Sequence, residues 1–60
     1  MKRKALLKLL SKNGCVLVRE GANHSLFHNT LTDRYSTVPR HNEIDDFLAK
    51  KILKDLEIIS

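Results

Sequence analysis

The stretch CVLVREGANHSLFHNT, residues 15–30, has the pattern of two strands joined by a turn. CVLVRE, residues 15–20, is β-branched and apolar, which is typical of a strand. Gly21-Ala22-Asn23 has the composition of a turn, and HSLFHNT, residues 24–30, predicts a second strand. The stretch therefore predicts an antiparallel hairpin.

The residues on either side extend this hairpin into a larger pattern. Residues 31–34 predict a turn and YSTVP, residues 35–39, a third strand that ends at Pro39, since proline cannot donate to a ladder. Upstream, residues 3–13 predict a helix that ends at Asn13-Gly14. Its apolar stripe consists of Ala5, Leu6, Leu9 and Leu10.

The last element is an amphipathic helix of about 14 residues, expected to start near Asn42 as N-cap. Acidic residues in its first turn complement the helix dipole, namely Glu43, Asp45 and Asp46. Apolar residues recur every fourth position at Ile44, Leu48, Ile52 and Leu56. Phe47 and Leu53 widen this stripe, so Phe47 is expected in the core.

The element order is therefore αβββα, an α+β fold. Three antiparallel strands with both helices on one face would bury both apolar helix stripes in one core. The other face of the sheet would stay free for binding. Because successive strand residues alternate between faces, Phe27 is expected on the face opposite His24, Leu26 and His28.

Length and charge narrow the function. The chain has 60 residues, which predicts a single domain over 1–60, and its net charge is +4. Residues 1–19 carry six basic residues and no acidic one, which favours a nucleic-acid partner. Cys15 is the only cysteine, which excludes an internal disulfide. Without a signal peptide or an apolar run of about 20 residues, we predict a soluble cytoplasmic protein with no membrane contact.

His24 and His28 are the candidate chemical groups. On a strand, four residues span about 13 Å, so one metal ion cannot bind both side chains, and we predict no metal site and no cofactor. Alone, His24 is an acid–base candidate beside a turn, since histidine exchanges protons near neutral pH. The alternative is a surface or hydrogen-bonding histidine.

Other residues are candidates for phosphate contacts. Lys4, Lys8 and Lys12 are spaced by four along one side of the first helix, and a tolerated row of like charges suggests phosphate contacts, although a solvated helix face is the alternative. Arg40 and His41 precede the last helix, whose N-terminus would suit phosphate. The aromatic residues are Phe27, Tyr35 and Phe47, too few for a platform, which disfavours recognition by base stacking.

Three motifs resemble the HicA family of bacterial toxins over most of the chain. They are LLSKNGCVLVRE at the end of the basic helix, GANHSLF, and TVPRHNEI before the amphipathic helix. In this resemblance His24 matches the catalytic histidine of the family, and Val38-Pro39 with His41 match its Val-Pro-x-His segment. Two features depart from the usual pattern: Ala22 and Asn23 separate Gly21 from His24, and Phe47-Leu48-Ala49 stands where many members have Gly-Thr-Leu.

The resemblance implies a fold like that of a double-stranded-RNA-binding domain. It also implies an mRNA interferase that cuts RNA without a metal and is silenced by a cognate HicB-type antitoxin. We therefore predict an endoribonuclease toxin with His24 as general base or acid. Its phosphate-binding residues are predicted to be Lys4, Lys8, Lys12, Arg19, Arg40 and His41.

The second proton carrier stays open between His28 and His41. Two rival functions also stay open, a non-catalytic double-stranded-RNA-binding module of the same fold and a small protein-interaction domain whose charge is incidental.

Overall fold

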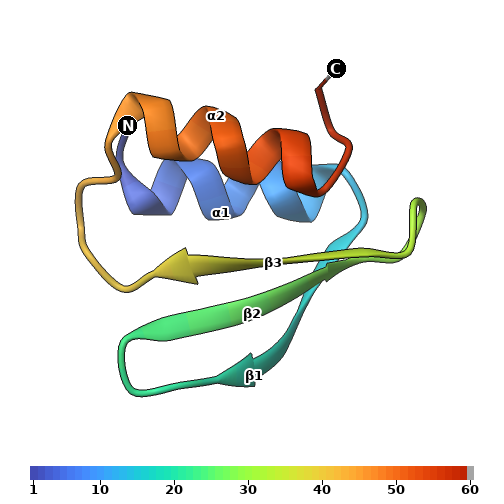
Figure 1. Cartoon of the computed structure of the whole chain (residues 1–60), viewed down its shortest axis with the longest axis horizontal. Helices are drawn as coiled ribbons and strands as arrows, with labels where there is room; N and C mark the ends of the chain where they lie inside the picture. Colours follow the sequence, from blue (N-terminus) through green and yellow to red (C-terminus); the bar gives the residue numbers. More distant parts are fainter. Residues whose placement is uncertain (60) are drawn as a thin grey trace.

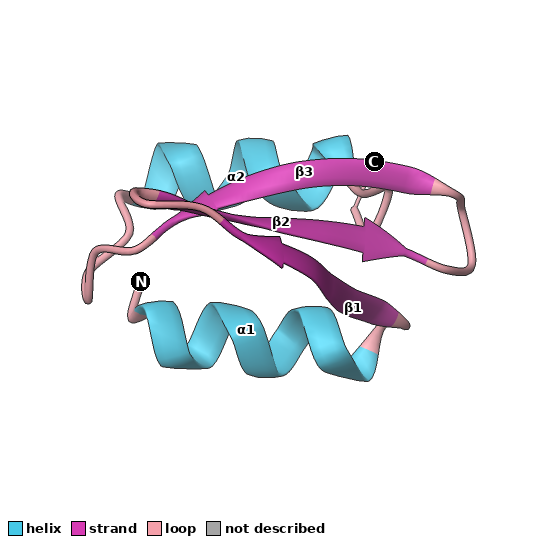
Figure 2. Ribbon diagram, turned by 90° about the horizontal axis from the view of Figure 1, so that it is seen from below, coloured by secondary structure: helices cyan, strands magenta, loops and turns pink. Residues whose placement is uncertain are grey.

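The computed structural model describes residues 1–59 and has the predicted αβββα order (Figure 1). Helix α1 (Arg3–Lys12) precedes strands β1 (Cys15–Glu20), β2 (His24–Asn29) and β3 (Arg34–Pro39), and helix α2 (Asp46–Asp55) follows them. The sheet is antiparallel with β2 in the centre. Both helices lie on the same face of the sheet, α1 along β1 and α2 along β3 (Figure 2).

The two faces of β2 differ as its alternation predicts. Ser25, Phe27 and Asn29 are buried toward the helices, whereas His24, Leu26 and His28 lie on the outer face. The prediction for Phe27 is therefore confirmed. The core between the layers consists mainly of Leu6, Leu10, Phe27, Val38, Ala49, Ile52 and Leu56.

A β-bulge changes which residue of β1 joins the outer face. Leu17 pairs with Phe27, but the register then shifts and Arg19 pairs with Leu26. Without the extra residue, Val18 would lie beside Leu26. The bulge therefore places the Arg19 side chain, rather than that of Val18, on the face that carries His24.

The predicted end of the first helix is confirmed. Asn13 is the C-cap of α1, and Gly14 follows with φ of 83°. Such a left-handed conformation suits glycine, which has no Cβ.

The predicted start of the second helix is wrong. Asp45, not Asn42, is the N-cap of α2, and its carboxylate accepts hydrogen bonds from the backbone N–H groups of Phe47 and Leu48 at 3.1 and 3.3 Å. Residues 42–44 instead precede the helix and pair with the start of the chain through the bridge between Lys2 and Glu43. The Arg3 N–H donates to the Asn42 carbonyl at 2.9 Å, and the Ile44 N–H donates to the Met1 carbonyl at 2.7 Å.

The expectation that Phe47 is in the core is also wrong. Its side chain is 80% exposed, because Ala49, Ile52 and Leu56 define the buried side of α2. Ile44 is buried too, but it lies in the segment before the helix. It therefore does not indicate which side of α2 faces the core.

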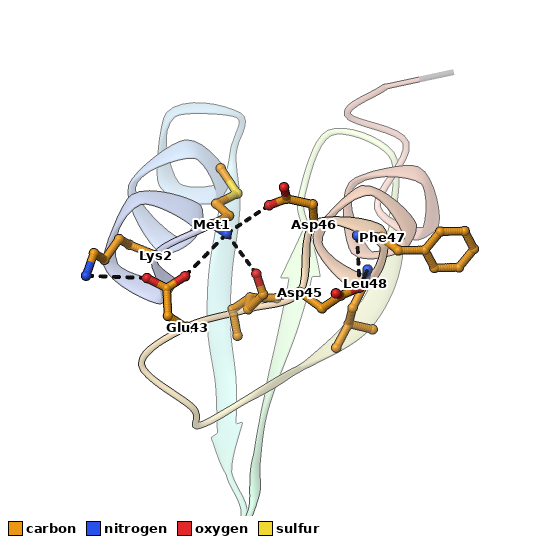
Figure 3. Close-up of polar contacts among 8 residues, drawn as sticks. Met1, Lys2, Glu43, Asp45, Asp46, Phe47 and Leu48 are labelled. Carbon is orange, nitrogen blue, oxygen red and sulfur yellow. Dashed lines mark hydrogen bonds and ion pairs between the residues drawn. The ribbon is translucent and has the colours of Figure 1, made fainter.

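The start of the chain is tied to the start of α2 by polar contacts (Figure 3). The Met1 ammonium donates to the Ile44 carbonyl at 2.8 Å and to Asp46 Oδ1 at 2.9 Å. Lys2 and Glu43 form an ion pair at 3.3 Å. These contacts hold the first turn of α1 beside the first turn of α2. Within residues 1–59, neither helix is long and apolar enough to cross a membrane.

Candidate active site

His24 is exposed at the start of β2 and lies between two hollows on the surface. One hollow, of about 360 Å³, is lined by Arg19, Gly21, Ala22, Asn23, His24, Leu26 and Thr37. The other, of about 380 Å³, is lined by Ala22, Asn23, His24, Arg40 and His41. A ligand beside the His24 imidazole therefore meets an arginine on either side.

The turn before His24 depends on Gly21. The Gly21 N–H donates to the His24 carbonyl at 2.7 Å and closes the turn. A Cβ atom at position 21 would lie only 2.9 Å from the same carbonyl oxygen. The predicted turn therefore needs glycine at this position because the His24 carbonyl approaches it closely.

A polar network on the helix side supports the residue next to His24. Ser25 is fully buried, and its hydroxyl donates to Glu20 Oε1. Arg3 donates from Nη2 to Ser25 Oγ and from Nε to the Pro39 carbonyl, both at 2.9 Å. Arg3 therefore links α1 to Ser25 at the start of β2 and to Pro39 at the end of β3, which are the chain neighbours of His24 and Arg40.

Arg40 joins the same network from the loop after β3. Its guanidinium lies 3.6 Å from Glu20 Oε2 and donates to the Gly21 carbonyl at 3.4 Å. Its backbone N–H donates to the Asn23 carbonyl at 3.2 Å. The β1–β2 turn and the loop that carries Arg40 and His41 are thus tied together beside His24.

The predicted placement of Arg40 and His41 at the N-terminus of the second helix is wrong. Helix α2 begins only at Asp46, and Asp45 already accepts from the N–H groups of Phe47 and Leu48. Arg40 and His41 lie instead in the loop before it, where the second hollow brings them beside His24.

Arg19 and the lysine row lie in different places. Arg19 shares the first hollow with His24, and no ion pair occupies its guanidinium within the described residues. Lys4 and Lys8 line hollows along α1, and Lys12 is exposed at its end. One of these hollows extends from Lys2, Arg3 and Lys4 to Asn42, the neighbour of His41. The lysine row therefore begins near the site and leads away from it.

His28 lies on the same face as His24 but has other partners. Its Nε2 lies 2.8 Å from Asp33 Oδ1, and its ring stacks on Tyr35 with centroids 4.3 Å apart. His28 pairs with Tyr35 across β3, whereas His24 pairs with Pro39. In the described part of the chain, no group of three or more His, Cys, Asp or Glu side chains is placed to hold a metal ion.

Sequence reasoning missed Arg3, Glu20 and Ser25. It counted Arg3 only as part of the basic end, and no spacing along the chain indicates that Arg3 meets Ser25, 22 positions away. Only the folded arrangement of α1 against the sheet brings them together.

The family model described as the HicA toxin of bacterial toxin–antitoxin systems matches residues 3–58. None of the curated proteins and none of the solved structures matches the chain. The matched range includes both helices, all three strands and every residue of the two hollows beside His24. The chain therefore belongs to the HicA family of toxins from bacterial toxin–antitoxin systems.

Proposed function

We propose that this toxin is a cytoplasmic endoribonuclease that cleaves mRNA by metal-independent acid–base chemistry centred on His24. A cognate HicB-type antitoxin would neutralise it. The observation that carries the proposal is the position of His24 between two hollows, with Arg19 in one and Arg40 and His41 in the other. Family membership supports the toxin role and the existence of an antitoxin partner.

The reaction is a transesterification within the RNA strand. The His24 imidazole accepts the proton of a ribose 2′-hydroxyl, whose oxygen attacks the adjacent phosphorus. The bond from phosphorus to the 5′-oxygen of the next nucleotide breaks, and that oxygen leaves with a proton from a general acid. The products are a 2′,3′-cyclic phosphate and a 5′-hydroxyl. Histidine suits the first step because its ordinary pKa is near neutrality.

Arginines on both sides of His24 suit the charge of the scissile phosphate. A guanidinium can bind two phosphate oxygens at once and keeps its charge at every physiological pH. Arg19 has no ion-pair partner among residues 1–59, whereas Arg40 is shared with Glu20. Arg19 is therefore the better candidate for the scissile phosphate, and Arg40 for a neighbouring one.

His41 is favoured over His28 as the group that protonates the leaving oxygen. His41 borders the same hollow as His24. The His28 ring is held between Asp33 and Tyr35 farther along β2. Beyond His41, the hollow that joins Asn42 to Lys2 and Lys4 offers a path by which the strand could reach the lysine row.

Growth after induction tests the proposed function. Expression of the wild-type chain without antitoxin is expected to stop growth, and His24→Ala is expected to relieve this at equal soluble expression. His28→Ala is a matched control, since it removes a histidine from the same strand and face and is expected to remain toxic. A non-catalytic RNA-binding module would instead leave the effect of expression unchanged by His24→Ala.

A further inference from the structure

A second surface lies on α2, away from the hollows beside His24. Phe47 is the most exposed large apolar residue of the described chain, and its ring points away from α1 (Figure 3). Lys50, Lys51 and Lys54 follow at the third, fourth and seventh positions, which places all four on one side of the helix. Together they line a hollow of about 260 Å³.

The charge of this surface is positive and largely uncompensated. None of the four residues that line the hollow is acidic. Lys51 pairs with Asp55 at 3.3 Å, whereas Lys50 and Lys54 have no ion pair within residues 1–59. Asp46, the acidic residue in the first turn, is already bound to the Met1 ammonium. Lysines four positions apart repel one another, so an anionic ligand would stabilise this face.

We propose that Phe47, Lys50, Lys51 and Lys54 form a second contact surface for single-stranded RNA. A base stacks on the Phe47 ring, and the lysines bind the phosphates beside it. Stacking on an aromatic side chain with cations nearby is a sequence-tolerant way to hold a single strand. The choice of RNA as the ligand rests on the proposed function. The sequence placed Phe47 in the core and disfavoured base stacking, whereas the exposed ring is accessible to a base.

The pattern fits a nucleic acid better than a protein partner. A stable protein interface buries about 800 Å² on each partner around a central apolar cluster. A helix that docks through an apolar face presents apolar anchors at positions i, i+3, i+4 and i+7. On α2, three of these four positions are lysines and only the first is apolar. One ring with several cations matches the chemistry of a base with its phosphates.

The place of the surface also suits a strand that passes His24. The β1–β2 turn, the loop after β3 and the start of α2 all lie at the same end of the molecule (Figure 1). Phe47 is the second residue of α2 and thus lies at this end. An RNA strand bound beside His24 and Arg40 could therefore continue to Phe47.

The experiment measures binding of a fluorescent single-stranded RNA of about 12 nucleotides, within the range of single-strand site sizes. All proteins carry His24→Ala so that the RNA stays uncut. Phe47→Ala is expected to weaken binding by about 5- to 150-fold, which corresponds to the range measured for loss of one stacked base. Phe47→Tyr keeps the ring and should retain most of the affinity. Leu31→Ala, which removes another highly exposed apolar side chain, is the matched control and should bind normally.

Salt dependence separates the ring from the lysines. The affinity of a single strand falls with salt, and each lost phosphate contact makes the negative slope of log affinity against log salt shallower by about 0.7. The double variant Lys50→Gln with Lys54→Gln is therefore expected to have a slope shallower by about 1.4. Phe47→Ala should leave the slope unchanged. Equal slopes in all variants would contradict the phosphate contacts.

Several results would overturn the proposal. One is normal RNA affinity in Phe47→Ala, and another is equal weakening by Leu31→Ala. If Phe47→Ala loses antitoxin binding but keeps normal RNA affinity, the surface binds a protein instead. The proposed function is tested separately. It is contradicted if protein with an intact His24 does not cut RNA, whatever the binding data show. If Phe47→Ala weakens binding although no cleavage occurs, the surface stands and the nuclease does not.

Discussion

Gly21 controls the position of His24 because it allows the chain to turn back on itself. A methyl group there would lie 2.9 Å from the His24 carbonyl oxygen, which accepts the hydrogen bond that closes the turn. Gly21→Ala is therefore expected to lower the free energy of unfolding by about 1–3 kcal/mol. Urea unfolding measures the loss. Ala22→Ser, at the exposed neighbouring position, should have little effect, and equal stability of Gly21→Ala and wild type would contradict this account of the turn.

In the proposed mechanism His41 donates a proton to the leaving 5′-oxygen, and a substrate with a changed leaving group can test this role. His41→Gln is expected to slow cleavage of ordinary RNA by about 10²–10⁴. An RNA with sulfur in place of the bridging 5′-oxygen has a leaving group that needs no proton. His41→Gln should cut this substrate at nearly the wild-type rate, whereas His24→Gln should not. If both substrates are slowed equally, His41 is not the general acid.

Sequence reasoning reached some residues of the candidate site and not others. The resemblance to the HicA family predicts the role of His24. The charge of Arg19, Arg40 and His41 and their positions in the sequence predict them as phosphate-binding residues. Arg3 and Ser25 were not reached, because their hydrogen bond joins a helix to a strand 22 positions away. Short-range patterns predict elements, whereas such a contact depends on how the elements pack.

The N-cap of α2 determines where this helix begins. Asp45 accepts hydrogen bonds from two N–H groups that no backbone carbonyl of the helix can reach. Asp45→Ala is therefore expected to lower stability by about 1 kcal/mol, the usual cost of a lost cap. Asn42→Ala is a matched control at the position that the sequence favoured. Thermal or urea unfolding measures the stability of both variants. A larger loss of stability in Asn42→Ala than in Asp45→Ala would contradict the observed cap.

The error in the start of α2 has a physical cause. Both Asn42 and Asp45 are good cap residues, so local preference allowed either. The pairing of residues 42–44 with the start of the chain decides between them, since it keeps these residues out of the helix. Once the helix starts later, Ala49, Ile52 and Leu56 face the core, and Phe47 faces solvent.

The order of the helices and strands in the complete fold is predictable from the sequence. Alternation in β2 and leucine spacing in α1 depend on neighbours a few positions apart, and the order αβββα with both helices on one face followed from them. A chain of this size buries a small core, so contacts between its layers matter. The Met1 ammonium is one of them, because it connects the start of α1 to α2.

The ion pair between the Met1 ammonium and Asp46 predicts a pH dependence of stability. The hydrogen bond from the ammonium lowers the pKa of Asp46, and Asp46 raises the pKa of the ammonium. The lowered carboxyl pKa stabilises the fold above about pH 4, and this gain is lost as the pH falls through the folded-state value. The raised amino pKa stabilises the fold below about pH 8, and that gain is lost as the pH rises through the folded-state value.

Comparison of wild type with Asp46→Asn by urea unfolding across pH measures this effect. The wild type should be the more stable protein between about pH 5 and 7, and the difference should shrink toward both extremes. Acetylation of the amino group should cause the same loss, and combining it with Asp46→Asn should add little. A stability difference that does not vary with pH would contradict the ion pair.

The most direct test of the account is the chemistry of the RNA ends that the purified toxin produces. Single-stranded RNA is incubated with the wild type in a chelator, and the products are identified by mass spectrometry. The proposed mechanism predicts 2′,3′-cyclic phosphate and 5′-hydroxyl ends. It also predicts a loss of cutting of at least about 10²-fold in His24→Ala, and no cutting where the attacking 2′-hydroxyl is replaced by hydrogen. Cleavage of that deoxy-substituted RNA, or an unchanged rate in folded His24→Ala, would contradict it.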